Sequence, residues 1–223
     1  MATGATADTK WTESQLDNLT VEGQFRLRGL EVTRLDTFID AAFAFVLTLL
    51  IISYEELPSD YTELIIAVKR IPAFAFSFAL LMMFWGRHRS WSRRYGLENS
   101  RTIPLSLALI FVVLVYVYPL RIILEAMFFD LSNGYLPSGF QIQAIDELRR
   151  IFVFYSVGFF AMSLILNQLY GSAMRSSSSL GLNQSELRNT RLSMQSWAVA
   201  ASFAPLSVLL ALVVSDAWIA LAG

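Results

Sequence analysis

Charged side chains stand inside an otherwise apolar segment near the start of the chain, and they are the first candidates for chemistry. Arg34, Asp36 and Asp40 belong to a stretch, residues 34–54, that is apolar from Ala41 to Ile52 apart from one Thr. An ionisable side chain in the hydrocarbon part of a bilayer costs about 2.5–3.5 kcal/mol or more unless water or a partner stabilises it. These side chains therefore either mark a membrane–water interface or form a polar network with another helix, and the sequence leaves both interpretations open.

Residue types that commonly carry catalysis or bind metals are scarce. The chain has no Cys and a single His, His88. Thiol chemistry and a metal site built on several imidazoles are therefore excluded. No Asp or Glu residues converge in the middle of the apolar stretches. We expect a protein that is not an enzyme and that holds no cofactor.

The distribution of charge along the 223 residues indicates a membrane protein. Residues 71–86, 102–120, 151–170 and 192–215 contain no Asp, Glu, Lys, Arg or His. Such stretches reach or approach the roughly 20 apolar residues that cross a hydrocarbon core of about 30 Å as a helix. A soluble domain would instead intersperse charges throughout its sequence. We therefore predict an all-α integral membrane protein.

The pattern predicts five membrane-spanning helices, with a sixth left open. The five spans are expected at about residues 34–54, 71–91, 103–128, 150–170 and from 191 onward, the second with an amphipathic lead-in at 61–70. Asp216 interrupts the last apolar run, so residues 217–223 are either the start of a sixth helix or an overrun of the fifth. Residues 1–33 are expected to form a polar, flexible N-terminal tail, in which residues 25–30 could form a short interfacial segment, and residues 34–223 the transmembrane domain.

Basic residues favour one set of loops, and this predicts the orientation in the membrane. The loop after the second span carries the clearest excess, with Arg87, Arg89, Arg93, Arg94 and Arg101. Because basic loops stay on the cytoplasmic side, the N-terminus is expected in the cytoplasm and the protein in the cell membrane. The lipid bilayer is then an obligatory partner, and we expect no nucleic acid partner.

The first span presents an apolar stripe at helical spacing. At 3.6 residues per turn, Phe38, Ala41, Phe45, Leu49 and Ile52 fall on one face, with Thr48 beside them. A stripe of this kind facing lipid would be ordinary. Facing a symmetry axis, it would form stacked apolar rings, which can gate a pore by expelling water. The spacing alone does not choose between these two environments.

Two separated motifs carry a resemblance to a known family. The first span resembles the first-helix signature of the lysosomal potassium channel family and its bacterial relatives, in which Arg and three residues precede Phe-Ser-Asp and an apolar run with Thr-Leu-Leu. The end of the second span looks like that family's Phe-Trp-x-x-His-His-Arg element. The matching residues of the first motif are Arg34, Phe38, Asp40, Phe43, Ala44, Thr48, Leu49 and Leu50, and those of the second are Phe84, Trp85, His88 and Arg89.

The resemblance implies a homotetrameric potassium channel whose first helix lines the pore, in a fold unlike that of ordinary potassium channels. The sequence also lacks the Thr-Val-Gly-Tyr-Gly filter segment of those channels. By resemblance, Phe45 stands at the narrowest apolar ring, Leu49 and Ile52 form the next rings, and the family's threonine hydroxyl falls at Thr48. Arg34, Trp85 and His88 are expected to hold the first helix to the second. For Trp85 alone, an interfacial aromatic anchor is the simpler alternative.

Three classes of function are compatible with the sequence. An ion channel subunit that passes potassium is favoured by the first-helix signature. A secondary transporter of a small cation or solute would have internal repeats and helices broken at mid-membrane; only Pro119 and Pro205 hint at such breaks. A membrane enzyme or scaffold is disfavoured by the missing catalytic residue types. We expect no metal beyond permeating potassium.

Overall fold

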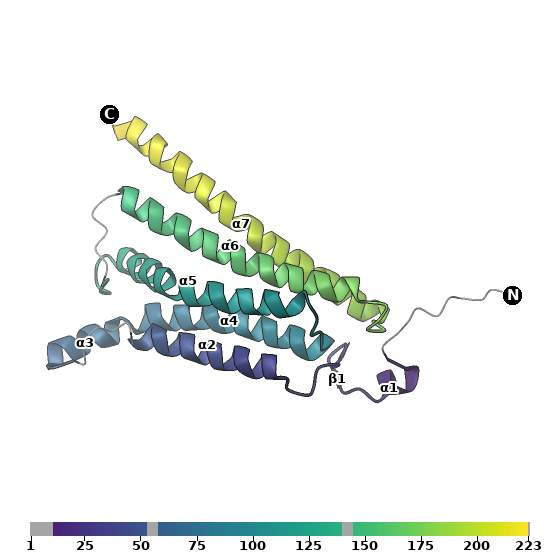
Figure 1. Ribbon diagram of the computed structural model, residues 1–223. Coiled ribbons are helices and arrows are strands. Elements are labelled where there is room, and N and C mark those ends of the chain that lie inside the picture. Colours follow the sequence, from purple (N-terminus) through teal and green to yellow (C-terminus); the bar gives the residue numbers. More distant parts are fainter. Residues whose placement is uncertain (1–10, 53–57, 140–144, 223) are drawn as a thin grey trace.

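Long helices make up nearly all of the chain. This computed structural model describes residues 11–52, 58–139 and 145–222. The long helices lie roughly side by side and are preceded by a short helix and a small antiparallel hairpin (Figure 1). In chain order the elements are α1 (Glu13–Asp17), β1 (Val21–Glu22), β2 (Phe25–Arg26), α2 (Arg34–Ile52), α3 (Tyr61–Lys69), α4 (Ile71–Tyr95), α5 (Thr102–Leu131), α6 (Ile145–Arg175) and α7 (Gln184–Ala222).

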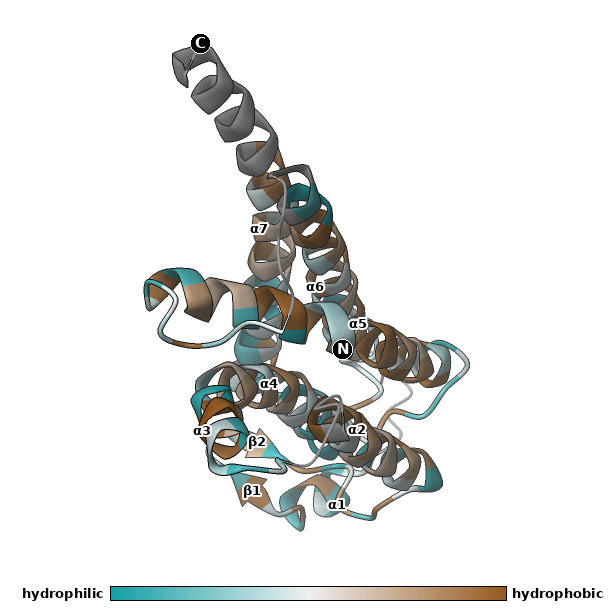
Figure 2. Cartoon of the chain, turned by 90° about the vertical axis from the view of Figure 1, so that its left-hand side faces the viewer, coloured by the Kyte–Doolittle hydropathy of each residue, from teal (hydrophilic) through white to brown (hydrophobic). Residues whose placement is uncertain are grey.

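Among the described residues, four helical segments have the length and composition to cross a membrane. They are Tyr61–Tyr95, Thr102–Leu131, Arg149–Arg175 and Gln184–Leu209. The second to fifth predicted spans fall within them or begin there, and the predicted fold class, an all-α membrane protein, is confirmed. Residues 34–52 of the first predicted span form α2, 19 residues long, whose first two turns hold Arg34, Asp36 and Asp40. Residues 53–54 of that prediction lie outside the described residues. Hydrophobic residues run along the helices in Figure 2, as expected where lipid replaces water.

The amphipathic lead-in to the second span is a separate helix, α3. Asp60 caps it by accepting a hydrogen bond from the Glu63 amide at 2.8 Å. Pro72 lies in the first turn of α4, where its missing N–H is not needed. Gly96 ends α4 in the left-handed region with φ +55°, and a Cβ there would approach the Arg28 carbonyl oxygen to 2.8 Å. Glycine is therefore required at this turn.

The helices pack as a bundle with α2 at one side and α7 at the other (Figure 1). Helix α2 packs on α4 and α5, while α6 contacts α5 and pairs with α7 along much of its length. At the α5–α6 contact the Tyr116 ring lies against Gly158, where an added Cβ would come within 2.2 Å of the ring. The buried core includes Phe84, Leu109, Leu120, Met162 and Leu169.

Helix α7 settles the question of the last residues. It runs from Gln184 to Ala222 with Pro205 inside it, so the residues after Ser215 continue the same helix. At about 1.5 Å per residue, its 39 residues extend roughly 58 Å, nearly twice the hydrocarbon thickness. One part of α7 must therefore extend beyond the hydrocarbon. The polar residues at its start, Gln184 to Ser196, are the part suited to that position.

The segment from Trp11 to Thr33 folds against the helices, which differs from the flexible tail that we expected. Leu16, Phe25 and Leu27 are buried, and the Phe25 ring packs edge-on against Tyr95 of α4 at 5.7 Å. These apolar residues are spaced among polar ones, so composition alone did not distinguish the segment from a tail. The division of the chain at residue 34 into a tail and a channel domain stays a prediction.

Candidate functional site

Helix α2 begins with a reciprocal cap. The Thr33 hydroxyl accepts a hydrogen bond from the Asp36 amide at 3.1 Å, and the Asp36 carboxylate accepts from the Thr33 amide at 3.3 Å. The carboxylate also lies at the positive end of the helix dipole, where a negative charge is favourable. The start of α2 is therefore fixed locally by residues 33–36.

Two carboxylates of α2 attach it to α4. The other oxygen of Asp36 accepts a hydrogen bond from the Ser92 hydroxyl at 2.6 Å. One turn later, Asp40 accepts from the Trp85 indole N–H at 2.7 Å. Asp36 and Asp40 of α2 thus contact two side chains of the antiparallel α4 that lie seven residues apart, Ser92 and Trp85. Both acids serve as hydrogen-bond acceptors between helices, which is the polar network that the sequence left open as one of two interpretations.

Arg34 and His88 occupy positions different from those that the resemblance implied. Arg34 is exposed, and the guanidinium that lies over the Trp85 ring, at 5.5 Å, is that of Arg89. His88 is buried, and its Nε2 shares a hydrogen bond with the Ser106 hydroxyl of α5 at 2.9 Å. Trp85 therefore contacts α2 through Asp40 rather than through Arg34, and His88 connects α4 to α5 rather than to α2.

Helix α2 has one buried face and one open face. Ile39, Phe43, Val46 and Leu50 are buried against the bundle. On the opposite side, Phe38, Phe45 and Ile51 are more than half exposed, and Ala41, Ala44 and Thr48 are exposed with them. We call this set the open face of α2. A large apolar surface without a partner in the single chain must be covered by lipid or by another protein chain.

The predicted apolar stripe and the open face of α2 share most but not all of their residues. Phe38, Ala41 and Phe45 belong to it, whereas Leu49 is half-buried and sits beside it, and Thr48 is exposed. The side chain of Ile52 lies outside the described residues. The Thr48 hydroxyl donates a hydrogen bond to the Phe45 carbonyl oxygen at 2.6 Å. Its proton is thus held by the backbone, and its lone pairs remain for another ligand.

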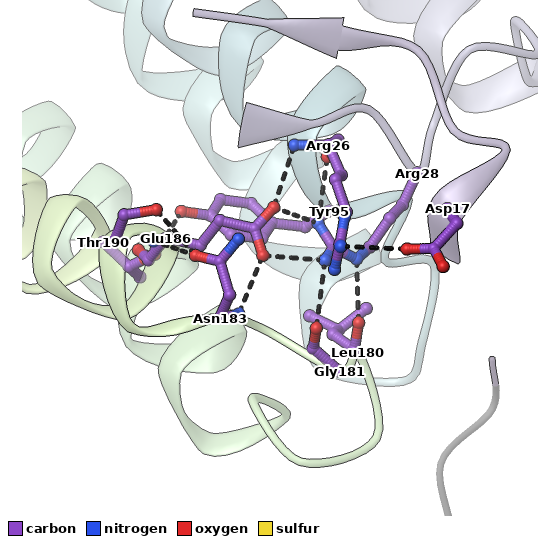
Figure 3. A network of polar contacts seen from close by, with 10 residues as sticks. Asp17, Arg26, Arg28, Tyr95, Leu180, Gly181, Asn183, Glu186 and Thr190 are labelled. Carbon is purple, nitrogen blue, oxygen red and sulfur yellow. Dashed lines mark hydrogen bonds and ion pairs between the residues drawn. The ribbon is translucent and has the colours of Figure 1, made fainter. Parts of the chain in front are cut away.

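A buried ion pair that no pattern in the sequence predicts connects the segment just before α2 to α7. Arg28 binds Glu186 of α7 through both terminal nitrogens at 2.9 Å, and both side chains are fully buried. Figure 3 shows the Arg28 guanidinium enclosed by Glu186 and by the carbonyl groups of Leu180 and Gly181, with which it makes hydrogen bonds of 2.8 and 3.3 Å. The charge of Arg28 is thereby fully compensated.

The same Glu186 carboxylate completes the start of α7. It accepts hydrogen bonds from the amides of Asn183 and Arg26, at 2.9 and 2.8 Å. The Asn183 side chain in turn accepts from the Glu186 amide at 2.9 Å. This Asn-x-x-Glu arrangement is a capping box, and its spacing was the one signal in the sequence for a helix start at residue 184. The pairing with Arg28, 158 residues away, has no local signal.

Chemically, these residues form a support for α2. Within the described ranges, no group of three His, Cys, Asp or Glu side chains lies close enough to hold a metal ion. The polar contacts fix the first turns of α2 to α4 and the preceding segment to α7. The open face beyond them presents apolar side chains and one hydroxyl.

Known proteins are similar to this chain in sequence and in fold. The model of a family described as the endosomal/lysosomal potassium channel TMEM175 matches residues 34–119. A potassium channel of Marivirga tractuosa is 32% identical over 200 residues, which cover 87% of this chain and 79% of the relative. A crystal structure of a variant of the potassium channel MtTMEM175, in complex with a nanobody–MBP fusion protein, superposes with a TM-score of 0.77 at 30% identity. That match covers 86% of this chain and 85% of the other.

Proposed function

This chain belongs to the TMEM175 family of potassium channels, and we propose that it is a potassium-conducting subunit whose conduction path is lined by the open face of α2. The family is one of ion channels, not of enzymes, and potassium is the permeant ion that it implies. The observation that carries the assignment of the path is the open face itself. Asp36 and Asp40 attach α2 to α4 on one side, and the side chains of Phe45 and Thr48 are exposed on the other.

A closed path requires more than one copy of α2. One helix with one open face offers no enclosed channel for an ion, whereas several copies around a symmetry axis would enclose one. We propose a homotetramer, in which the open faces meet at the axis and the remaining surface contacts lipid and neighbouring subunits. The relatives support a channel, and the number four comes from the resemblance of the first helix.

The open face would form successive rings along the axis. Phe45 is proposed as the constriction, and Thr48 as a ring of hydroxyl groups about one turn further along the helix. Leu49 and Ile52 are proposed as the apolar rings that follow. Apolar rings of small radius exclude water and so control conduction without any moving charge. Arg34, Phe38 and Asp40 stand near the entrance, and Trp85 and His88 brace the helices behind it.

The basic end of α4 supports the proposed orientation. Arg87, Arg89, Arg93 and Arg94 lie at the end of this helix, on the side of the bundle where the N-terminal segment also packs. Because basic ends of spans stay in the cytoplasm, we place this side and the N-terminus there, in a multi-pass protein of the cell membrane.

Flux through reconstituted protein tests the function. Liposomes that contain the purified protein are loaded with potassium and diluted into potassium-free buffer without a potassium ionophore, and a protonophore balances the charge. They are expected to lose potassium passively. A channel gives uncoupled flux that reverses with the gradient. Strictly coupled exchange that saturates with substrate would indicate a transporter instead and would contradict the proposal.

The assembly is tested by mass. Purified protein in nanodiscs is expected to have the mass of four chains of 25.1 kDa, beyond the contribution of lipid and scaffold. Native mass spectrometry or light scattering coupled to chromatography measures this directly. A stable monomer under conditions in which the same preparation conducts would show that α2 does not line a shared axis.

A further inference from the structure

A groove lies between the N-terminal hairpin and helices α4, α6 and α7, and no residue of α2 lines it. It has a volume of about 610 Å³, which is within the range typical of small-molecule sites. None of the proposed pore residues lines it. Its lining residues are Glu22, Gly23, Gln24, Phe25, Met83, Arg87, Arg94, Phe159, Tyr170, Asn189, Leu192, Ser193, Ser196, Trp197 and Ala200.

Polarity changes along the groove in the same direction on all three helices. On α4 the lining goes from Met83 to Arg87 and Arg94, and on α6 from Phe159 to Tyr170. On the antiparallel α7 it goes the other way along the chain, from Asn189 to Ala200. Each helix contributes a length of 11 residue steps, roughly 17 Å. One end of the groove is therefore apolar, and the other is polar and basic.

The basic end holds two guanidinium groups that are available to an anion. The acid in the lining, Glu22, pairs with Arg93 at 3.4 Å, outside the groove lining. Arg94 lies over the Phe25 ring at 4.7 Å, which orients it without neutralising its charge. Arg87 is exposed and has no ion pair within the described residues. Both arginines therefore face the groove with their charge uncompensated.

We propose that this groove binds an anionic phospholipid from the leaflet at the basic ends of the spans. The phosphate lies between Arg87 and Arg94, and an acyl chain runs along Met83, Phe159 and Trp197 toward Ala200. Arginine forks match phosphate oxygens well, and the positive ends of membrane spans attract anionic lipid. A free phosphate would use the basic end alone and leave the apolar end without an occupant, so the polarity gradient favours the lipid. The proposal rests on the membrane location and does not depend on conduction.

Lipid-dependent stabilisation of the full chain tests this site. Delipidated protein in detergent is titrated with phosphatidylglycerol, phosphatidylcholine or inorganic phosphate, and binding is measured by native mass spectrometry and by the thermal unfolding midpoint. Phosphatidylglycerol is expected to raise the midpoint, and neither phosphatidylcholine nor phosphate to do so. The double variant Arg87→Gln, Arg94→Gln is expected to bind phosphatidylglycerol with an affinity at least about tenfold lower than that of the wild type. Arg101→Gln, an exposed arginine outside the groove, is the matched control and keeps wild-type binding.

A second variant tests the apolar end without altering charge. Ala200→Phe fills the end of the groove and is expected to weaken binding of phosphatidylglycerol while leaving both arginines in place. Equal binding of both lipids, or wild-type binding by the double variant, overturns the proposal. Competition by millimolar phosphate would indicate a phosphate site instead. Loss of the oligomer in lipid-free detergent on Arg87→Gln, Arg94→Gln would indicate that another subunit occupies the groove.

Discussion

Glu186→Gln is expected to lower the free energy of unfolding by about 3–5 kcal/mol, the cost of leaving a buried charge without its partner. The Glu186 carboxylate accepts from four donors: two terminal nitrogens of Arg28 and the amides of Arg26 and Asn183. A glutamine has one oxygen and one NH₂ group, so at least one of these buried donors would face another donor. The shape of the side chain is kept, and the loss therefore reports on charge and hydrogen bonding rather than on packing.

The control is an exposed ion pair in the same segment. Asp17 contacts Arg26 at 3.3 Å, but 74% of the Asp17 side chain is exposed. Asp17→Asn is expected to change stability by less than about 1 kcal/mol, because solvent screens such pairs. Arg28→Lys keeps the charge and loses the two-pronged contact, so its loss is expected to lie between the other two. Unfolding of the purified variants is followed by circular dichroism over a denaturant series. Equal denaturation midpoints for Glu186→Gln and Asp17→Asn would show that the buried ion pair does not stabilise the packing of the N-terminal segment on α7.

The spans were predictable because hydrocarbon imposes a simple rule on composition. Residues 102–120 of α5 contain no charged residue. A stretch of this length and composition is stable in a bilayer as a membrane-spanning helix, because a helix satisfies its backbone hydrogen bonds internally. The lead-in α3 was predictable for a similar reason, since Pro72 marks the start of a new helix and Asp60 can cap the preceding one. The extent of α7 was less so, because Asp216 looked like a boundary and the helix continues past it.

Contacts between distant residues were less predictable than the residue types that make them. The sequence pointed to Asp40 and Trp85, but it did not show that they bind each other, or that Arg89 rather than Arg34 lies over the indole. Both arginines have the right charge, and only the packing of α2 on α4 selects one. The Arg28–Glu186 pair joins segments 158 residues apart, and in the sequence Arg28 was one more basic residue in a polar segment.

Hydrophobic periodicity also could not identify the face of α2 that is open. In a membrane protein both faces of a helix are apolar, because one packs in the bundle and the other faces lipid or a neighbour. Phe43 and Phe45 illustrate this: one is 2% exposed and the other 57%. Only the positions of α4 and α5 assign the first to the core and the second to the open face.

Phe45→Ala is expected to raise basal potassium flux several-fold and to reduce the preference for potassium over sodium. Phenyl rings from several subunits around an axis would leave little room for a hydrated cation and would exclude water, so shortening them should widen and wet the constriction. Unitary conductance and the reversal potential under mixed potassium and sodium gradients measure the two effects. The control is Phe111→Ala on α5, because Phe111 is a phenylalanine of another helix that is 68% exposed, against 57% for Phe45. It is expected to leave both quantities unchanged.

Thr48→Val separates the ring of hydroxyl groups from the constriction. Valine keeps the shape of threonine but removes the oxygen that now bonds to the Phe45 carbonyl. Selectivity is expected to fall with little change in basal flux, and Thr48→Ser, which keeps the hydroxyl, is expected to preserve it. If Phe45 faced lipid instead of an axis, Phe45→Ala would remove only apolar surface and would alter neither conductance nor reversal potential. Unchanged values for both Phe45→Ala and Thr48→Val would therefore exclude the open face of α2 from the conduction path, whatever other helix then lined it.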